Sequence, residues 1–267
     1  MIRINDKKID MKHFPDGTML IKYLADNEST KITWLYDNDE EYMGIFFLVK
    51  HLRTHGVKKI ELFMPYIPNA RMDRVKNSDE VFTLKYFAEF INDFKFDSVE
   101  VLDPHSNVST ALIDNISIIE PTDIILNLLE TVNSDGNTIL FFPDEGAMKR
   151  YSHIASKCDI PYVFGMKNRD WRSGEILGLE VLGETDAVPG KNILIIDDIC
   201  SRGGTFLHSA KALKAMGAAD IDLYVSHLEN SVWEGDMIRS GLVRNIYTTN
   251  SIYRFQDKGP VKVVKEY

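Results

Sequence analysis

Cysteine is scarce in this chain, with only Cys158 and Cys200 among 267 residues. Two cysteines cannot build the disulfide framework of a small secreted protein, and they lack the spacing of a metal site. The sequence also has no run of about 18 apolar residues that could cross a bilayer. Its first residues, MIRINDKKIDMKHF, lack the apolar region of a secretory signal. We therefore expect a cytoplasmic protein in a reducing compartment, without a membrane partner.

Positive charge is scarce as well, since 31 lysines and arginines stand against 40 acidic residues, a net charge of −9. No long basic run could follow a nucleic-acid backbone, so nucleic acid is not an expected partner. Nucleotides and sugar phosphates are not excluded, because their sites use a few backbone amides and local cations. Hydrophobic residues at 44% and charged residues at 27% are ordinary for a folded globular protein and exclude a disordered or fibrous one.

Short apolar segments alternate with helical periodicity along the chain. The segments are 32–37, 59–66, 98–103, 138–144, 192–198 and 220–227. This alternation predicts an α/β fold with parallel sheets, and the nearly continuous apolar runs indicate helices on both faces. After Ser78, a spacing of three and four predicts one helical face made of Val81, Leu84, Phe87, Ile91 and Phe94.

The length fits one large domain or two modest ones. An offset of 161 positions aligns residues 52–62 with 213–223, so that Gly56 falls on Gly217. Two interpretations stay open: a duplicated domain, or the helix, glycine cap and buried strand that recur in any α/β protein. The turn-rich segment 131–138 predicts a boundary between domains 1–135 and 136–267.

The most specific motif is ILIIDDICSRGGTF, residues 193–206. An apolar strand ends in Asp197 and Asp198, and a short loop enters a helix through Gly-Gly-Thr. Glycines let main-chain N–H groups approach an anion, and paired carboxylates can accept hydrogen bonds from ribose hydroxyls. The motif therefore predicts a sugar-phosphate site, the alternative being an acidic strand end before a capped helix.

Polar residues follow three other expected strands. Arg71 and Arg74 come after the second, Asp103 and His105 end the third, and Asp144 ends the fourth. Ligands of parallel sheets bind at these strand ends, so the arginines could clamp a triphosphate and the others could support Mg²⁺. From residue type alone, the alternatives are surface arginines, a loop hydrogen bond and a helix N-cap.

Lys167 and Arg169 lie in KNRDWRSGE, residues 167–175. We expect a charged connection between strands that is suited to closing over a transferring phosphoryl group. The alternative is a solvated charged surface.

Residues 193–206 resemble the phosphoribosyl-diphosphate (PRPP) motif of type I phosphoribosyltransferases and ribose-phosphate diphosphokinases. Further segments are similar to the diphosphokinases, in family order: FPDGT (14–18), MPYIPNARMDR (64–74), VLDPHS (101–106), FPDEGAMKR (142–150) and MKNRD (166–170). The transferases lack the second and third. The resemblance implies two similar domains of the type I phosphoribosyltransferase fold, and a transfer of diphosphate from Mg-ATP to ribose 5-phosphate with release of AMP.

The resemblance also implies a role for each matched position. The catalytic residues would be Lys167 and Arg169. Ribose and its phosphate would contact Asp197, Asp198, Ser201, Arg202, Gly203, Gly204 and Thr205. ATP would contact Phe14, Asp16, Arg71, Asp73, Arg74 and His105, and Mg²⁺ would be held at His105 and Asp144. Phe14 and Asp16 would reach adenine in a neighbouring subunit, which implies a homo-oligomer, a dimer or a hexamer.

Four positions depart from the family pattern. In the sugar-phosphate loop, the family's Asp-Thr before the two glycines is Ser201-Arg202, so the loop has lost an acid and gained an arginine. In the other segments, a family glutamine is replaced by Met72 and a family glutamate by Thr18. An added guanidinium can contact phosphate through two N–H groups and can stack on a base. Arg202 would therefore suit an acceptor with more than a terminal monophosphate, such as ADP-ribose. The resemblance extends to a branch of the family that places diphosphate on ADP-ribose for NAD synthesis, which implies ADP-ribose as a second candidate acceptor.

Two alternative functions stay open. A phosphoribosyltransferase is disfavoured by the segments 64–74 and 101–106. A non-catalytic regulatory family member is disfavoured because the matched catalytic and Mg²⁺-site residues are all present.

Overall fold

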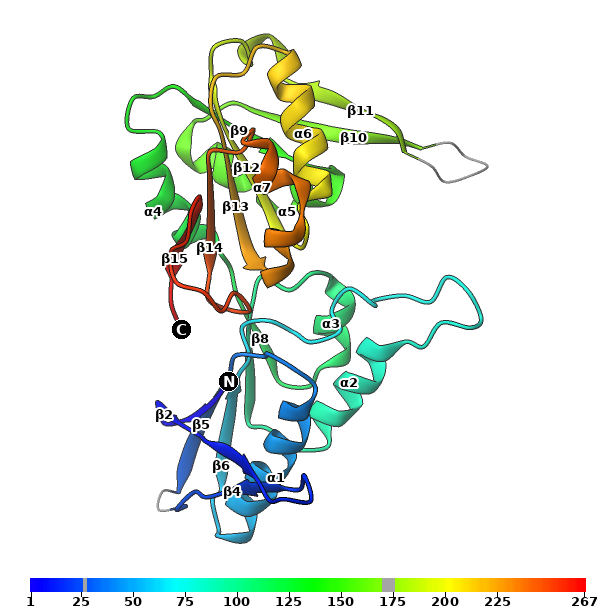
Figure 1. Ribbon diagram of the computed structural model, residues 1–267, viewed down its shortest axis with the longest axis vertical. Coiled ribbons are helices and arrows are strands. Elements are labelled where there is room, and N and C mark those ends of the chain that lie inside the picture. The colour runs from blue at the N-terminus through cyan, green and yellow to red at the C-terminus, as the bar shows by residue number, and fades with distance from the viewer. Residues whose placement is uncertain (26–27, 170–175) are drawn as a thin grey trace. The chain divides into compact units, whose positions relative to one another are not determined.

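The computed structural model describes residues 1–25, 28–169 and 176–267. It describes the side chains of all these residues except 167–169 and 176–178. In these parts, the chain forms two compact units, Met1–Glu120 and Pro121–Tyr267 (Figure 1). The boundary lies one helix before the position expected from the turn-rich segment.

The helix between the two positions is α4 (Thr122–Val132). Its buried residues Ile125 and Leu129 share a core cluster with Phe142 of the second unit. Because the apolar face of α4 is buried there, the turn-rich segment 131–138 connects two elements of one unit. Turn residues marked a turn correctly, but that turn is not a domain boundary.

Unit 1 contains a sheet in the order β2-β1-β5-β6-β7-β8 and a separate hairpin, β3-β4. The sheet strands are β1 (Ile2–Ile4), β2 (Lys7–Lys8), β5 (Ser29–Trp34), β6 (Lys59–Phe63), β7 (Ser98–Leu102) and β8 (Ile116–Ile119). The hairpin strands are β3 (Met11–His13) and β4 (Met19–Ile21), and the helices are α1 (Glu40–Thr54), α2 (Thr83–Asn92) and α3 (Asn107–Leu112). Strands β5 to β8 run parallel.

Helix α2 confirms the expected helical face, although it begins later than Ser78. Leu84, Phe87 and Ile91 are buried in the core of unit 1. Val81 precedes the first helical residue and is exposed. The periodicity therefore identified the face, while the extended residues before it gave no signal of where the helix starts.

Unit 2 contains a sheet in the order β11-β10-β9-β12-β13-β14-β15. Its strands are β9 (Thr138–Phe142), β10 (Tyr162–Arg169), β11 (Ile176–Gly183), β12 (Asn192–Cys200), β13 (Ile221–Leu228), β14 (Asn245–Thr249) and β15 (Val261–Lys265). Besides α4, its helices are α5 (Glu145–Cys158), α6 (Gly204–Ala215) and α7 (Asp236–Ser240), with 3₁₀ turns at Thr185–Ala187 and Asn230–Glu234. Only β11 pairs antiparallel within the described sheet.

Strand β12 shows why the apolar runs are continuous. Ile193 and Ile195 pack in the cluster that contains α6, whereas Leu194 and Ile196 pack in the cluster that contains α4 and α5. Successive side chains point to opposite faces of a strand, so a strand covered on both faces is apolar at every position. The expected α/β architecture, with parallel sheets flanked by helices, is confirmed.

The aligned glycines occupy the same position in each unit. Gly56 ends α1 with φ +82° and Gly217 ends α6 with φ +88°, a conformation that favours glycine. The next residue donates its N–H to the carbonyl of Leu52 in one case and of Leu213 in the other, each at 3.1 Å. These hydrogen bonds form a Schellman motif that turns each helix into the following strand.

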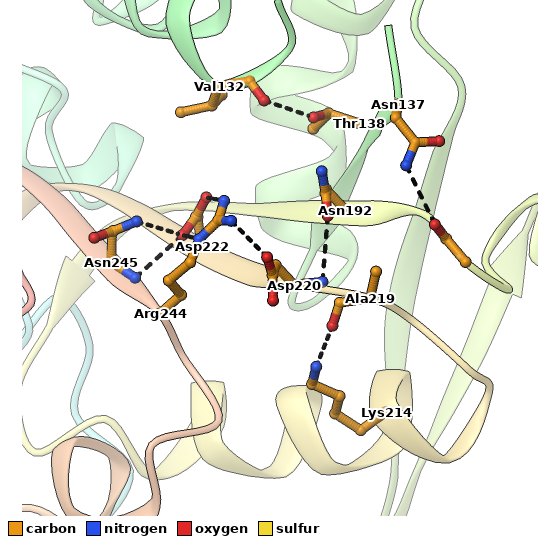
Figure 2. Close-up of polar contacts among 11 residues, drawn as sticks. Val132, Asn137, Thr138, Asn192, Lys214, Ala219, Asp220, Asp222, Arg244 and Asn245 are labelled. Atoms are coloured by element: carbon orange, nitrogen blue, oxygen red, sulfur yellow. Dashed lines mark hydrogen bonds and ion pairs between the residues drawn. The ribbon is translucent and has the colours of Figure 1, made fainter. Parts of the chain in front are cut away.

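The amino end of the second sheet is joined by a network around Asp222 (Figure 2). Arg244 donates to both carboxylate oxygens of Asp222, from Nε at 3.1 Å and from Nη2 at 2.6 Å. The main-chain and side-chain N–H groups of Asn245 donate to the same buried carboxylate at 3.1 and 3.0 Å. Hydrogen bonding to Asp222 raises the pKa of Arg244, and the network fastens β13 to the start of β14.

None of the described helices has the length and apolar character needed to span a membrane. Both cysteines are free thiols, with Cys200 buried and Cys158 half-buried.

Candidate active site

The order of the strands in unit 2 changes direction between β9 and β12. From β9 the chain passes through α5 to β10 on one side, and from β12 it passes through α6 to β13 on the other. Because β9 and β12 are neighbours, the loops after them diverge, and ligands of such sheets bind where the loops part. Asp144 follows β9, and Asp197 and Asp198 lie near the end of β12.

These three carboxylates influence one another. Burial raises the pKa of Asp197 well above its usual range, and the negative charges of Asp198 and Asp144 raise it further. The N–H of Asp198 donates to Asp197 Oδ1 at 2.9 Å, and Arg150 Nη1 lies 3.8 Å from Asp198 Oδ2. The cluster holds more negative charge than its cationic neighbour balances, so hydroxyl donors or a cation would be bound favourably here.

Asp144 also caps α5, as the alternative interpretation predicted. Its Oδ1 accepts a hydrogen bond from the N–H of Ala147 at 3.1 Å. Among the residues that the structure describes, no three His, Cys, Asp or Glu side chains form a metal-binding group. Mg²⁺ is commonly held by one or two carboxylates together with water and phosphate oxygens. The carboxylates around Asp197 therefore fit Mg²⁺ that arrives with a phosphate ligand.

The two glycines after β12 differ in backbone conformation and in the space around them. Gly203 is the N-cap of α6 with φ +79°, and a Cβ on it would lie 2.7 Å from Met237 Sδ. Gly204 is exposed, and a Cβ there would meet no atom within 4 Å. There is therefore open space beside Gly204 at the start of α6, where the first N–H groups of a helix have no intrahelical acceptor and an anion can approach.

The chain after β13 braces this loop. Arg202 Nη2 donates to Glu234 Oε2 at 2.9 Å, and Ser201 Oγ lies 3.3 Å from Ser231 Oγ. A Cβ on Gly235 would lie 1.9 Å from the carbonyl oxygen of Arg202, so the two backbones touch. The sequence predicted the loop but not its contacts with residues 231–235, because their sequence, SVWEG, carries no recognisable motif.

Lys167 and Arg169 lie at the end of β10, which corrects the expectation of a connecting loop. The backbone pairs antiparallel with β11, with Lys167 opposite Leu179 and Arg169 opposite Ile176. The two strands form an arm that extends from the sheet (Figure 1). Charged residues are as compatible with an exposed pair of strands as with a loop, so the composition of this segment could not distinguish the two structures. Their side chains and residues 170–175 lie outside the described residues.

In unit 1, the polar residues after β6 and β7 come together at the carboxyl edge of the sheet. Arg74 Nε donates to Asp73 Oδ1 at 2.9 Å. Burial raises the pKa of Asp73, but the hydrogen bond from Arg74 and the charges of Arg74 and His105 outweigh it, and the pKa is lowered. Arg71 is exposed, whereas Asp103 is buried with φ +40°.

The FPDGT segment forms the turn between β3 and β4. Phe14 is exposed, and its N–H donates to the carbonyl of Thr18 at 2.9 Å. Asp16 Oδ1 accepts from the N–H and the hydroxyl of Thr18 at 3.0 and 2.7 Å, which lowers the pKa of Asp16. The threonine that replaces the family glutamate therefore fixes the orientation of the preceding aspartate.

Comparison with known proteins finds similarity along most of the chain. A family model described as "Phosphoribosyl transferase domain" matches residues 113–242. The ribose-phosphate pyrophosphokinase of Saccharolobus solfataricus is 26% identical over 250 residues, 92% of this chain and 84% of the relative. That of Thermococcus kodakarensis is 27% identical over 251 residues, 92% of this chain and 86% of the relative. The chain is thus similar to the ribose-phosphate pyrophosphokinase family over most of its length.

The fold agrees with this family. The phosphoribosylpyrophosphate synthetase from Mycobacterium smegmatis superposes with a TM-score of 0.78 at 18% identity. The match covers 97% of this chain and 86% of that structure. The similarity in fold therefore spans both units.

Proposed function

We propose that this pyrophosphokinase-family protein transfers the β,γ-diphosphoryl group of ATP to the anomeric hydroxyl of ribose 5-phosphate. The anomeric oxygen attacks the β-phosphorus, the bond from that phosphorus to the bridging oxygen of the α-phosphate breaks, and AMP leaves. The hydroxyl proton passes to solvent, and no covalent enzyme intermediate forms. The products are PRPP and AMP.

The observation that carries the proposal is the pair Asp197 and Asp198 beside the open start of α6. The carboxylates accept hydrogen bonds from the ribose hydroxyls, while the amides at Gly204 and Thr205 bind the 5-phosphate. A ribose hydroxyl that donates to these carboxylates would offset the mutual repulsion that raises the pKa of Asp197. This arrangement orients the sugar through its two ends and leaves the anomeric carbon free to react.

On the ATP side, we assign the phosphates to Arg71 and Arg74 and to His105 beside the buried Asp73. Asp73 holds Arg74 in place through the 2.9 Å hydrogen bond. Mg²⁺, which Asp144 and His105 would hold, supplies positive charge that neutralises the phosphate oxygens. Lys167 and Arg169 add positive charge to the transferring group, where preorganised donors are worth about 10²- to 10³-fold in rate.

The exposed Phe14 at the tip of a hairpin supports a further assignment. We assign Phe14 and Asp16 to the adenine of a neighbouring subunit, which requires a homo-oligomer. Phe14→Ala is expected to raise the KM for ATP, and sedimentation should show an assembly larger than a monomer.

The test is to incubate the protein with Mg-ATP and ribose 5-phosphate and to identify the products by mass. AMP and PRPP in equal amounts support the proposal. Asp197→Asn combined with Asp198→Asn should weaken ribose 5-phosphate binding while ATP binding persists. Consumption of PRPP with a nucleobase would instead show a transferase, and absence of AMP would support the regulatory alternative.

ADP-ribose is the second candidate acceptor, and Arg202 is the observation that favours it. Its guanidinium is 70% exposed beside the proposed phosphate site, although it pairs with Glu234 there. A phosphate contact is worth roughly 1.5 to 3 kcal/mol, so Arg202→Thr should lower kcat/KM for ADP-ribose by about 10- to 100-fold. Equal losses with ribose 5-phosphate would show that Arg202 does not select the larger acceptor.

A further inference from the structure

The amino-terminal hairpins of unit 1 enclose a cavity of about 350 Å³ that no assigned residue lines. Four lysines line it: Lys7, Lys8, Lys12 and Lys22. The volume lies in the range of sites for small molecules. None of the residues that line the cavity lies in a segment that resembles a family motif.

The pairing of β3 with β4 explains why lysines gather on one side. Lys12 lies opposite Leu20, and Met11 lies opposite Ile21. Successive side chains alternate between faces, so Lys12, Leu20 and Lys22 share the face toward the cavity. Met11 and Ile21 on the other face pack against the core of unit 1. The hairpin is therefore anchored by one face and presents charge on the other.

Strand β2 supplies Lys7 and Lys8 to the lining of the cavity. The turn at Asn5 and Asp6, with φ +46° and +66°, brings Lys7 and Lys8 back along β1. The N–H of Ile9 donates to the carbonyl of Ile2 at 2.9 Å, and the Ile9 side chain is buried. Ile9 and Leu20 give the cavity an apolar floor beneath its charged rim.

The residues that the structure describes do not balance the positive charge of these lysines. All four lysines are exposed, and none forms an ion pair with a residue that the structure describes. Asp10 is the one acidic residue in the lining, so four positive charges face one negative charge. In a chain of net charge −9, this is a local reversal of sign. An anion with several charges would relieve the repulsion among the lysines.

We propose that this lysine cavity binds an oligophosphate, an anion of two or more linked phosphate groups. Lysine is a common phosphate ligand that acts as a point charge, and four lysines contributed by two hairpins offer more positive charge than a single phosphate group needs. Inorganic oligophosphate and the phosphate chain of a nucleotide share this chemistry. The proposal does not depend on the reaction assigned above.

The first test maps the site by lysine acetylation. The protein is acetylated with and without inorganic triphosphate, against sodium chloride of equal ionic strength, and each lysine is quantified by mass spectrometry. Lys12 and Lys22 should react about fivefold or more slowly with triphosphate, while Lys58 and Lys85 of the same unit should be unchanged. Equal rates at all four, or equal protection of all four, would overturn the proposal.

The second test uses matched variants and titration calorimetry. Lys12→Gln with Lys22→Gln should weaken triphosphate binding at this site by about tenfold or more, whereas Lys58→Gln with Lys85→Gln should not. A site that persists in both variants lies elsewhere, and unchanged binding in the first variant refutes the assignment. Equal melting temperatures of the two variants show that folding is intact.

The same acetylation assay separates the sources of the phosphate chain. Equal protection by triphosphate and ATP shows that the phosphates alone are recognised. Stronger protection by ATP shows that the nucleoside lies on the floor of Ile9 and Leu20. Protection by adenosine alone, without any by triphosphate, contradicts the proposal.

Discussion

Gly203 and Gly204 are adjacent, yet we expect their substitution by alanine to have opposite consequences. Gly203→Ala should destabilise the protein, because the residue has φ +79° and its Cβ would lie 2.7 to 2.8 Å from three atoms of Met237. The left-handed backbone costs about 1 to 2 kcal/mol for a residue with a Cβ. Met237 is buried and has little room to move, which adds roughly 1 to 3 kcal/mol of overpacking. The total is about 2 to 5 kcal/mol.

Gly204→Ala should leave stability unchanged or raise it by up to about 1 kcal/mol, since alanine favours the helix and its Cβ meets nothing within 4 Å. The same methyl group projects into the space where the 5-phosphate is proposed to bind. We therefore expect the KM for ribose 5-phosphate to rise about tenfold or more, with a smaller change in the KM for ATP.

Urea denaturation gives the first quantity for both variants, and steady-state formation of AMP gives the second. The reasoning is refuted if Gly204→Ala keeps the wild-type KM for ribose 5-phosphate, because the open space at α6 would then not be the phosphate site. It is also refuted if Gly203→Ala is as stable as the wild type.

Three further predictions address other parts of the molecule. Lys167→Ala should lower turnover by about 10²-fold or more while ATP still binds, because the lost charge acts in the transition state; turnover within threefold of wild type would refute the assignment. Asp222→Asn should cost about 1.5 to 3 kcal/mol in urea denaturation, nearer the lower figure because Arg244 is 45% exposed, and should leave AMP formation per folded molecule unchanged. The raised pKa of Asp197 means that the folded protein binds a proton that the unfolded chain releases above pH about 4, so this group lowers stability as pH rises. Asp197→Asn should therefore be the more stable protein near neutral pH, and a stability curve parallel to that of wild type from pH 4 to 8 would contradict this.

The strands that the sequence predicted are those with continuous apolar runs. Segment 220–227 differs by one residue at each end from β13 (Ile221–Leu228). Segment 59–66 extended too far, since β6 ends at Phe63 before Pro65, which has no N–H to donate to a neighbouring strand. Strands β14 and β15 were missed because they are short and carry polar side chains at intervals.

The candidate site was predicted in pieces but not as an assembly. Asp144 and the pair Asp197 and Asp198 were found separately, each at the end of an apolar run, and nothing in the sequence says that β9 and β12 are neighbours. That adjacency depends on the direction in which each helix crosses the sheet, which follows from packing on both faces and not from local periodicity. It brings three carboxylates close enough to raise the pKa of Asp197.

The two edges of the second sheet show why these carboxylates are better explained by binding than by stability. At the amino edge, buried Asp222 accepts hydrogen bonds from a guanidinium and from two N–H groups of the next strand, and its charge is satisfied by the protein. At the carboxyl edge, Asp197 is crowded by two other carboxylates, which opposes its ionisation. A protein selected for stability alone would replace such an aspartate, since its amide analogue carries no charge to bury. This unfavourable arrangement is the one expected where carboxylates are retained to bind the hydroxyl groups or cations of a substrate.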